Sequence, residues 1–194
     1  MPINDEALDV IFRAARSHRH WQDKPVSPAL LMAIYELMRW GPTSGNCCPA
    51  RIVFVVSKEA KERLRPHLDA GNVTKTMTAP ATAILGYDLD FARFLPRLAP
   101  HNPAAADTFE DPVLAETTAF RNGSVEGGYF IVAARALGLD CGPMSGFDNE
   151  GLDREFFAGT AIKSNFLCNL GYGDNSDIKP RNPRLAFDEA CKIV

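Results

Sequence analysis

Val113–Leu139, with the sequence VLAETTAFRNGSVEGGYFIVAARALGL, is the longest regular pattern in the chain. Apolar side chains recur along it at the spacing of a helix face, namely Phe120, Val125, Tyr129, Val132, Ala133, Ala136 and Leu137. The pattern predicts one long helix over 113–139 that ends at Gly138. Gly127 and Gly128 lie in its middle, where each glycine costs about 1 kcal/mol relative to alanine. We therefore expect another backbone to pack closely there, and a second subunit is one source of it.

The segments after this helix alternate between strand and helix patterns. Asp140–Met144 is short and strand-like, and Ser145–Asp148 forms a turn into a helix that runs through Phe157. Asn165–Leu170 is an apolar run of strand length, and the tail over 179–185 is basic and extended. Strands and helices thus follow the long helix without a repeating unit.

The segments before the long helix show the same irregular alternation. Helices are predicted over 5–16, 28–38 and 58–68, and strands over 52–56 and 81–87. The segment 88–112 contains four prolines and has no clear period, which is typical of a lid or excursion. No βαβ regularity is visible, so the fold class is α+β, with residues 1–194 forming a single domain.

Composition and charge exclude several classes of partner. The chain of 194 residues is 46% hydrophobic and carries a formal charge of -3, whereas nucleic-acid binding requires a basic face. No window approaches the roughly 18 apolar residues of a membrane span, and the first residues lack the pattern of a secretory signal. We expect a cytoplasmic protein with neither nucleic-acid nor membrane partners.

The five cysteines are expected to be reduced thiols. Their positions, 47, 48, 141, 168 and 191, give no spacing typical of a metal site, so no metal is predicted. The glycine-rich turn before Cys47 and Cys48 could expose these two thiols. A thiol-dependent redox reaction therefore stays open, although no adjacent cation favours a lowered pKa.

Two basic clusters lie far apart in the sequence. Arg16-Ser17-His18-Arg19 follows the first helix, and Lys179, Arg181 and Arg184 lie in the tail. Several cations with a short hydroxyl are suited to a phosphate group. The alternative is ordinary: cations stabilise the C-terminal end of a helix, and basic tails are usually solvated.

The loop Trp40–Ala50 is longer than the connection between a helix and a strand requires. Thr43, Ser44 and Asn46 could donate hydrogen bonds to a ligand from this loop, or they could satisfy their own backbone. No glycine-rich dinucleotide motif, P-loop or nucleophile elbow is present. The sequence therefore offers no set of catalytic side chains.

Taken together, these clusters resemble the nitroreductase family of FMN-dependent oxidoreductases. Five motifs in register carry the resemblance: Arg16-Ser17-x-Arg19 with Trp21, Gly41-Pro-Thr-Ser-Gly-Asn46, Asn72-x-x-Lys75, Gly142-Pro-Met-Ser-Gly-Phe-Asp148 and Lys179-Pro-Arg181. The resemblance implies a central, mostly antiparallel sheet flanked by helices and an intertwined homodimer with FMN at the subunit interface. It also implies ping-pong transfer of hydride from NAD(P)H to a small acceptor. Since flavin supplies the chemistry, no catalytic side chain is required.

The resemblance also implies a role for each matching position. Arg16, Ser17, Arg19, Lys179 and Arg181 would hold the FMN phosphate. Thr43, Ser44 and Asn46 would reach the flavin from the partner subunit. Asn72 and Lys75 would meet the pyrimidine edge of the flavin, and Ser145 and the backbone N–H of Gly146 would lie near N5.

Longer phrases suggest the branch that contains the malonic semialdehyde reductase of bacterial pyrimidine degradation. They are Trp40-Gly-Pro-Thr-Ser44, Pro49–Phe54, Thr118–Asn122, Arg135–Asp140, Gly142–Asp148 and Gly171–Asp174. On this basis the acceptor is malonic semialdehyde, reduced to 3-hydroxypropionate. A general nitroreductase or quinone reductase, and a flavin-binding protein without turnover, remain the alternatives.

Three departures from common family patterns involve four positions. Cys48 and Ala50 stand where many members have glutamine and tryptophan, and Ser145 stands where some have glutamate. Ala15 replaces a second arginine before the serine. Phosphate binding is less affected by these departures than nicotinamide selectivity is.

Overall fold

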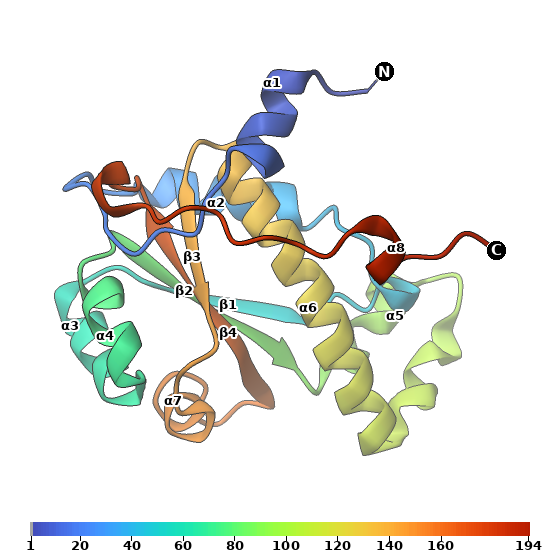
Figure 1. The fold of residues 1–194 in the computed structure, drawn as a ribbon. Coiled ribbons are helices and arrows are strands. Elements are labelled where there is room, and N and C mark those ends of the chain that lie inside the picture. The colour runs from blue at the N-terminus through green and yellow to red at the C-terminus, as the bar shows by residue number, and fades with distance from the viewer. Residues whose placement is uncertain (1) are drawn as a thin grey trace.

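The computed structural model describes residues 2–194 and contains a four-stranded sheet between two layers of helices (Figure 1). The strands are β1 (Ala50–Val55), β2 (Ala81–Asp88), β3 (Asp140–Met144) and β4 (Ile162–Gly171), in the order β1-β2-β4-β3. Every neighbouring pair is antiparallel. The α+β class and the antiparallel sheet expected from the sequence are therefore confirmed.

The helices cover the sheet on both faces. One layer consists of α2 (Pro28–Met38) and α6 (Pro112–Ala136), and the other of α3 (Lys58–Leu64), α4 (Ala70–Met77) and α7 (Asn149–Phe156). Strand β2 is buried along its whole length and serves both layers, because successive side chains of a strand point to opposite faces. Ala83 and Leu85 belong to the core under α2 and α6, whereas Ile84 belongs to the core under α3 and α7.

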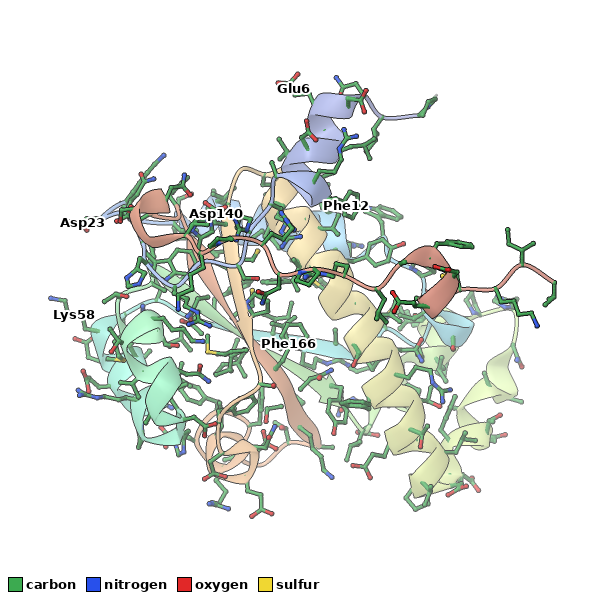
Figure 2. The ribbon with its side chains drawn as sticks, viewed as in Figure 1. Glu6, Phe12, Asp23, Lys58, Asp140 and Phe166 are labelled. Atoms are coloured by element: carbon green, nitrogen blue, oxygen red, sulfur yellow. The ribbon has the colours of Figure 1, made fainter. Side chains whose placement is uncertain are left out.

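The long helix predicted over 113–139 is α6, although it ends three residues earlier. Pro112 occupies its first turn and Asp111 caps it through a hydrogen bond from the backbone N–H of Val113. The expected close packing at Gly127 comes from within the chain and not from another backbone. A Cβ atom added at Gly127 would lie 2.5 Å from Cε1 of Phe166 on β4, whereas one at Gly128 would meet nothing within 4 Å. Figure 2 labels Phe166 in the centre of the molecule.

The N-terminal helix is shorter than predicted. It consists of α1 (Asp5–Leu8) followed by the π-helical turn η1 (Asp9–Arg13). The prediction of a helix to residue 16 was therefore wrong, because the chain leaves the wide turn at Ala14. As a result, Arg16–Arg19 lie in a loop that runs beside the edge strand β3, where the backbone N–H of His18 donates to the oxygen of Cys141 at 3.0 Å.

Helix α4 was not expected from the sequence, since 70–77 has little apolar content and Asp69 makes no side-chain cap. Tertiary contacts hold it instead. The ammonium group of Lys61, on α3, is buried and donates to the backbone oxygens of Thr76 (3.0 Å) and Ala79 at the end of α4. Burial lowers the pKa of Lys61 to about 8.

The remaining segments are short helical turns. They are η2 (Ser44–Asn46), η3 (Arg65–His67), η4 (Phe91–Phe94), α5 (Leu95–Leu98), η5 (Pro103–Glu110), η6 (Asn175–Asp177) and α8 (Phe187–Ala190). The excursion over 88–112 thus contains short turns and no long element, and Phe91 packs edge-on against Phe109 with ring centroids 4.7 Å apart. The C-terminal tail crosses α6 in Figure 1 and is exposed from Lys179 onward. Within the described residues, no helix combines the length and hydropathy needed to span a membrane.

Candidate functional site

A cleft of about 420 Å³ brings the two basic clusters of the sequence together. We call it the basic cleft. Its lining includes Arg16, Ser17, His18, Arg19, Arg135, Asp174, Lys179, Arg181 and Arg184. The guanidinium of Arg16 donates to the backbone oxygen of Lys179. Arg181 donates in return to the backbone oxygens of Arg13 (2.8 Å) and Ala15 (2.7 Å). The loop after η1 and the C-terminal tail are therefore tied together.

The basic cleft contains polar atoms suited to an anionic ligand. Arg135 enters from the last turn of α6, and its Nε atom is buried without a hydrogen-bond partner in the described part of the chain. Nδ1 of His18 is in the same state. A buried donor without a partner is costly, and a ligand with anionic oxygens would offset that cost for Arg135. The set of cations and a hydroxyl thus fits a phosphate group.

Helix α4 is held to the N-terminal loop and to β4 through the backbone oxygen of Lys75. The indole Nε1 of Trp21 donates to the backbone oxygen of Lys75 at 3.0 Å, and Asn169 on β4 donates to the same oxygen at 3.2 Å. Burial lowers the pKa of Lys75, and the positive charge of Arg19 lowers it further. Lys75 therefore lies close enough to the basic cleft for the positive charge of Arg19 to affect its pKa.

Asn72 connects α4 to the turn after β3. Its Nδ2 atom donates to the backbone oxygen of Gly146 at 2.6 Å, and the backbone N–H of Asp69 donates to the same oxygen at 3.2 Å. A Cβ atom at Gly146 would lie 2.6 Å from Oδ2 of Asp69 and 2.8 Å from Nδ2 of Asn72, so only glycine fits without a shift. Ser145 is exposed beside it. Hydrogen bonds thus connect the N-terminal loop, Lys75, Asn72 and Gly146.

Thr43, Ser44 and Asn46 lie elsewhere in the chain. The backbone N–H of Ser44 donates to Oδ1 of Asn122 (2.8 Å), Asn46 donates to the oxygen of Leu98 (2.8 Å), and Thr43 accepts from the backbone N–H of Cys48 (3.1 Å). In Figure 1 this light-blue segment lies near α5, to the right of α6, whereas the blue loop after η1 lies to the left. A single chain does not bring the three residues to the basic cleft.

A second cavity, of about 950 Å³, adjoins this loop and shares no lining residue with the basic cleft. Asn46, Cys48, Arg51, Phe94, Arg97 and Glu126 are part of its lining. Asp88 is buried nearby and pairs with Arg51 at 2.8 Å. Burial raises the pKa of Glu126, although its Oε2 atom accepts a hydrogen bond from the backbone N–H of Ala50.

The thiols in this loop are poorly suited to redox chemistry. Cys47 is buried, and burial raises its pKa to about 11, so its reactive thiolate form is scarce at neutral pH. Cys48 is half-buried, with its sulfur 3.8 Å from the hydroxyl oxygen of Thr43. Among the described residues, no group of three or more His, Cys, Asp or Glu could hold a metal ion.

Arg135 and His18 are among the residues of the basic cleft that sequence reasoning missed. Arg135 lies in the last turn of the predicted long helix, but the pattern of a helix does not indicate what lies across from its end. His18 falls between Ser17 and Arg19, so its place in the motif was a signal that was not used. Both are identified only once the loop, α6 and the tail are placed together.

Comparisons with known proteins point to one family. The Nitroreductase family profile matches residues 12–172. A protein of Cupriavidus pinatubonensis, provisionally named NADH dehydrogenase/NAD(P)H nitroreductase, is 56% identical over 193 residues, 98% of each chain. A Burkholderia lata protein with the same provisional name is 56% identical over 191 residues, again 98% of each chain.

A solved structure shares the fold at low sequence identity. It is described as a provisional nitroreductase of Exiguobacterium sibiricum in complex with FMN. The TM-score is 0.87 with 18% identity, and the match covers 100% of this chain and 99% of that chain.

Proposed function

Because the chain belongs to the nitroreductase family, we propose that it is an FMN-dependent oxidoreductase that transfers hydride from NAD(P)H to a small acceptor. Its relatives carry names that describe NAD(P)H nitroreductases, and a protein of the same fold was solved with FMN. Bound FMN would supply a flavin N5 that accepts hydride and passes it on. The protein itself would bind the cofactor, orient it and shield it from water.

The meeting of Arg16 and Arg181 in the basic cleft is the observation that carries this proposal. Two segments more than 160 positions apart are joined by hydrogen bonds of their guanidinium groups. Residues 179–184 of the tail include no large apolar side chain that would explain why this segment packs there. An anionic ligand shared by both segments provides an explanation, since charge-assisted hydrogen bonds to a phosphate are worth roughly 1.5–3 kcal/mol each.

From the phosphate site, the assigned residues continue toward the ring of the cofactor. Arg16, Ser17, Arg19, Lys179 and Arg181 hold the phosphate, while Asn72 and Lys75 meet the pyrimidine edge. A cation at Lys75 stabilises negative charge on the reduced ring. The backbone N–H of Gly146 and the neighbouring Ser145 face N5, and no side chain acts as a catalytic acid or base.

The complete site requires a homodimer. Thr43, Ser44 and Asn46 lie away from the basic cleft of their own chain, so they reach the flavin of the partner subunit. In support, large apolar side chains are exposed along α6 and in the tail, among them Val113, Phe120, Tyr129, Leu185 and Phe187. Large apolar side chains left exposed on one helix and in the tail favour an interface with a second subunit. Sedimentation of the purified protein as a dimer is expected, and a monomer that retains FMN would contradict this assignment.

For the acceptor we propose malonic semialdehyde, which is reduced to 3-hydroxypropionate in the cytoplasm. The six sequence phrases around Trp40, Arg51, Phe120, Leu137, Met144 and Tyr172 support this choice over a general nitroaromatic or quinone acceptor. The cytoplasm supplies NAD(P)H, and all five cysteines are free thiols, as expected in a reducing compartment.

Two measurements, made one after the other, test the proposed function. Protein reconstituted with FMN should retain a flavin absorption band near ~450 nm after gel filtration; a colourless protein would refute the proposal. NADH and NADPH oxidation should then be compared with malonic semialdehyde, a quinone and a nitroaromatic as acceptors. Preference for the quinone or the nitroaromatic would leave the oxidoreductase in place and overturn only the acceptor.

A flavin-binding protein without turnover is the second candidate. The departures at Cys48, Ala50 and Ser145 favour it, because these positions border the expected flavin site. It predicts the same colour, but no oxidation of NAD(P)H that depends on an added acceptor.

A further inference from the structure

The side chain of His18 is buried between two exposed neighbours in the N-terminal loop. The residue is 5% exposed, whereas Ser17 and Arg19 on either side are exposed. Neighbouring side chains of an extended segment point to opposite sides, so a buried His18 leaves Ser17 and Arg19 directed away from the protein interior. Both of them line the basic cleft.

Two glycines make room for His18. A Cβ atom at Gly173 would lie 2.0 Å from Nδ1 of the imidazole, and a Cβ atom at Gly142 would lie 2.7 Å from the backbone oxygen of His18. Neither distance is tolerated between non-bonded atoms. The chain therefore keeps two positions free of side chains where this one residue enters.

A carboxylate at the start of β3 fixes the orientation of the ring. Oδ1 of Asp140 lies 3.3 Å from Nε2 of His18, and Oδ2 of the same group accepts the backbone N–H of Gly173 at 2.8 Å. Figure 2 labels Asp140 at the start of β3, near the N-terminal loop. The loop, β3 and the segment after β4 are thus joined at one imidazole, together with the hydrogen bond from the His18 backbone to Cys141.

We propose that His18 is a positioning residue for phosphate binding, which holds Ser17 and Arg19 in the geometry that an FMN phosphate requires. This inference rests on the proposed function. The close approach of Nε2 to the Asp140 carboxylate and the contact with Gly173 carry the effect, because a loop free to shift would spread the donors over many arrangements. Ordering them in advance lowers the cost of binding.

The test compares FMN with riboflavin, which has the same ring system and no phosphate. Dissociation constants of both are measured by quenching of flavin fluorescence with apoprotein of the wild type, His18→Leu and His18→Gln. For His18→Leu, the preference for FMN over riboflavin should fall at least tenfold. His18→Gln, which keeps a donor for Asp140, should recover part of this preference. His101→Gln, a change at an exposed histidine, should behave as the wild type.

General loosening of the fold would weaken both flavins equally and leave their ratio unchanged. An unchanged ratio in His18→Leu would therefore overturn the positioning role. If His18→Leu does not fold, Asp140→Asn provides the same comparison, with a smaller fall of the ratio expected and an unchanged ratio again decisive against the inference. A wild type that binds riboflavin as tightly as FMN would instead refute the phosphate site of the proposed function.

Discussion

The indole of Trp21 donates a hydrogen bond of 3.0 Å to the backbone oxygen of Lys75, and this contact joins the N-terminal loop to α4. The loop brings the cations of the basic cleft, and α4 brings Asn72 and Lys75. This hydrogen bond therefore helps to set the distance between the two groups. A cofactor with a phosphate at one end and a ring at the other needs such a fixed separation.

Trp21→Phe is expected to lower the free energy of unfolding by about 1 kcal/mol, the net value of one hydrogen bond. The loss stays small because Asn169 still donates to the oxygen of Lys75. Urea denaturation of the wild type and the variant measures the difference. Equal stability of the two proteins would show that the hydrogen bond to Lys75 is no more favourable than the bond that the indole N–H makes to water in the unfolded chain.

Arg16→Ala combined with Arg181→Ala should weaken FMN binding by several kcal/mol, since each charge-assisted bond contributes roughly 1.5–3 kcal/mol. Flavin content after gel filtration and the dissociation constant of FMN measure the effect. Arg154→Ala is the control, because Arg154 is exposed on α7 and its nearest carboxylate, on Glu150, is 3.8 Å away. Equal flavin content in the double variant and the control would contradict the phosphate site.

Gly127→Ala and Gly128→Ala form a matched pair on α6. At Gly127 the added methyl group would press on the ring of Phe166, and overpacking of this kind costs roughly 1–3 kcal/mol. At Gly128 the space is open in the single chain, so alanine should stabilise an isolated subunit by up to about 1 kcal/mol. If that surface is covered in a dimer, Gly128→Ala should instead raise the dimer dissociation constant, as sedimentation would detect.

Lys61 predicts a particular dependence of stability on pH. Burial lowers its pKa from the usual 10.5 to about 8. Between these values the unfolded chain binds a proton that the folded chain does not, so the free energy of unfolding rises with pH across this window. Each pH unit between the two pKa values changes the free energy of unfolding by at most about 1.4 kcal/mol. The two backbone oxygens that accept from Lys61 make this change smaller, because they stabilise its charged form.

Lys61→Met keeps the aliphatic chain and removes the titrating group. Its free energy of unfolding, measured by denaturant titration at several pH values, should lack the part of the rise that belongs to Lys61. If the free energy of unfolding depends on pH in the same way in the variant and the wild type, the titrating group is not Lys61.

Activity should not depend on the paired thiols. Because the pKa of Cys47 is raised to about 11, Cys47→Ala with Cys48→Ser is expected to retain acceptor-dependent oxidation of NAD(P)H. If the double variant lost activity while its FMN content stayed normal, the result would support the alternative of a thiol-dependent redox reaction.

Most of the helices and strands could be predicted, because hydrophobic periodicity in the sequence indicates them. Helix α6 and strand β2 were evident from apolar spacing alone, since their buried faces leave a direct mark on the sequence. Helix α4 could not be found in this way. Its polar residues are held by Lys61 from another helix, and such a contact has no local signature.

The candidate site shows the same division. Arg16 and Arg181 were selected by type and motif, and the structure brings them together. Arg135 could not be selected, because its neighbours depend on how the tail crosses the end of α6. The close neighbour of Gly127 was expected from another backbone and is the ring of Phe166, since spacing along a helix does not identify the element that packs against it.

The outer edge of β1 makes a newly synthesised subunit vulnerable. Within the described residues, β1 pairs only with β2, and open strand edges are templates for misassociation between chains. Overproduction at high temperature should therefore favour insoluble material over native protein. Slow expression, or mild conditions that give each chain time to find its proper neighbour, should raise the soluble yield.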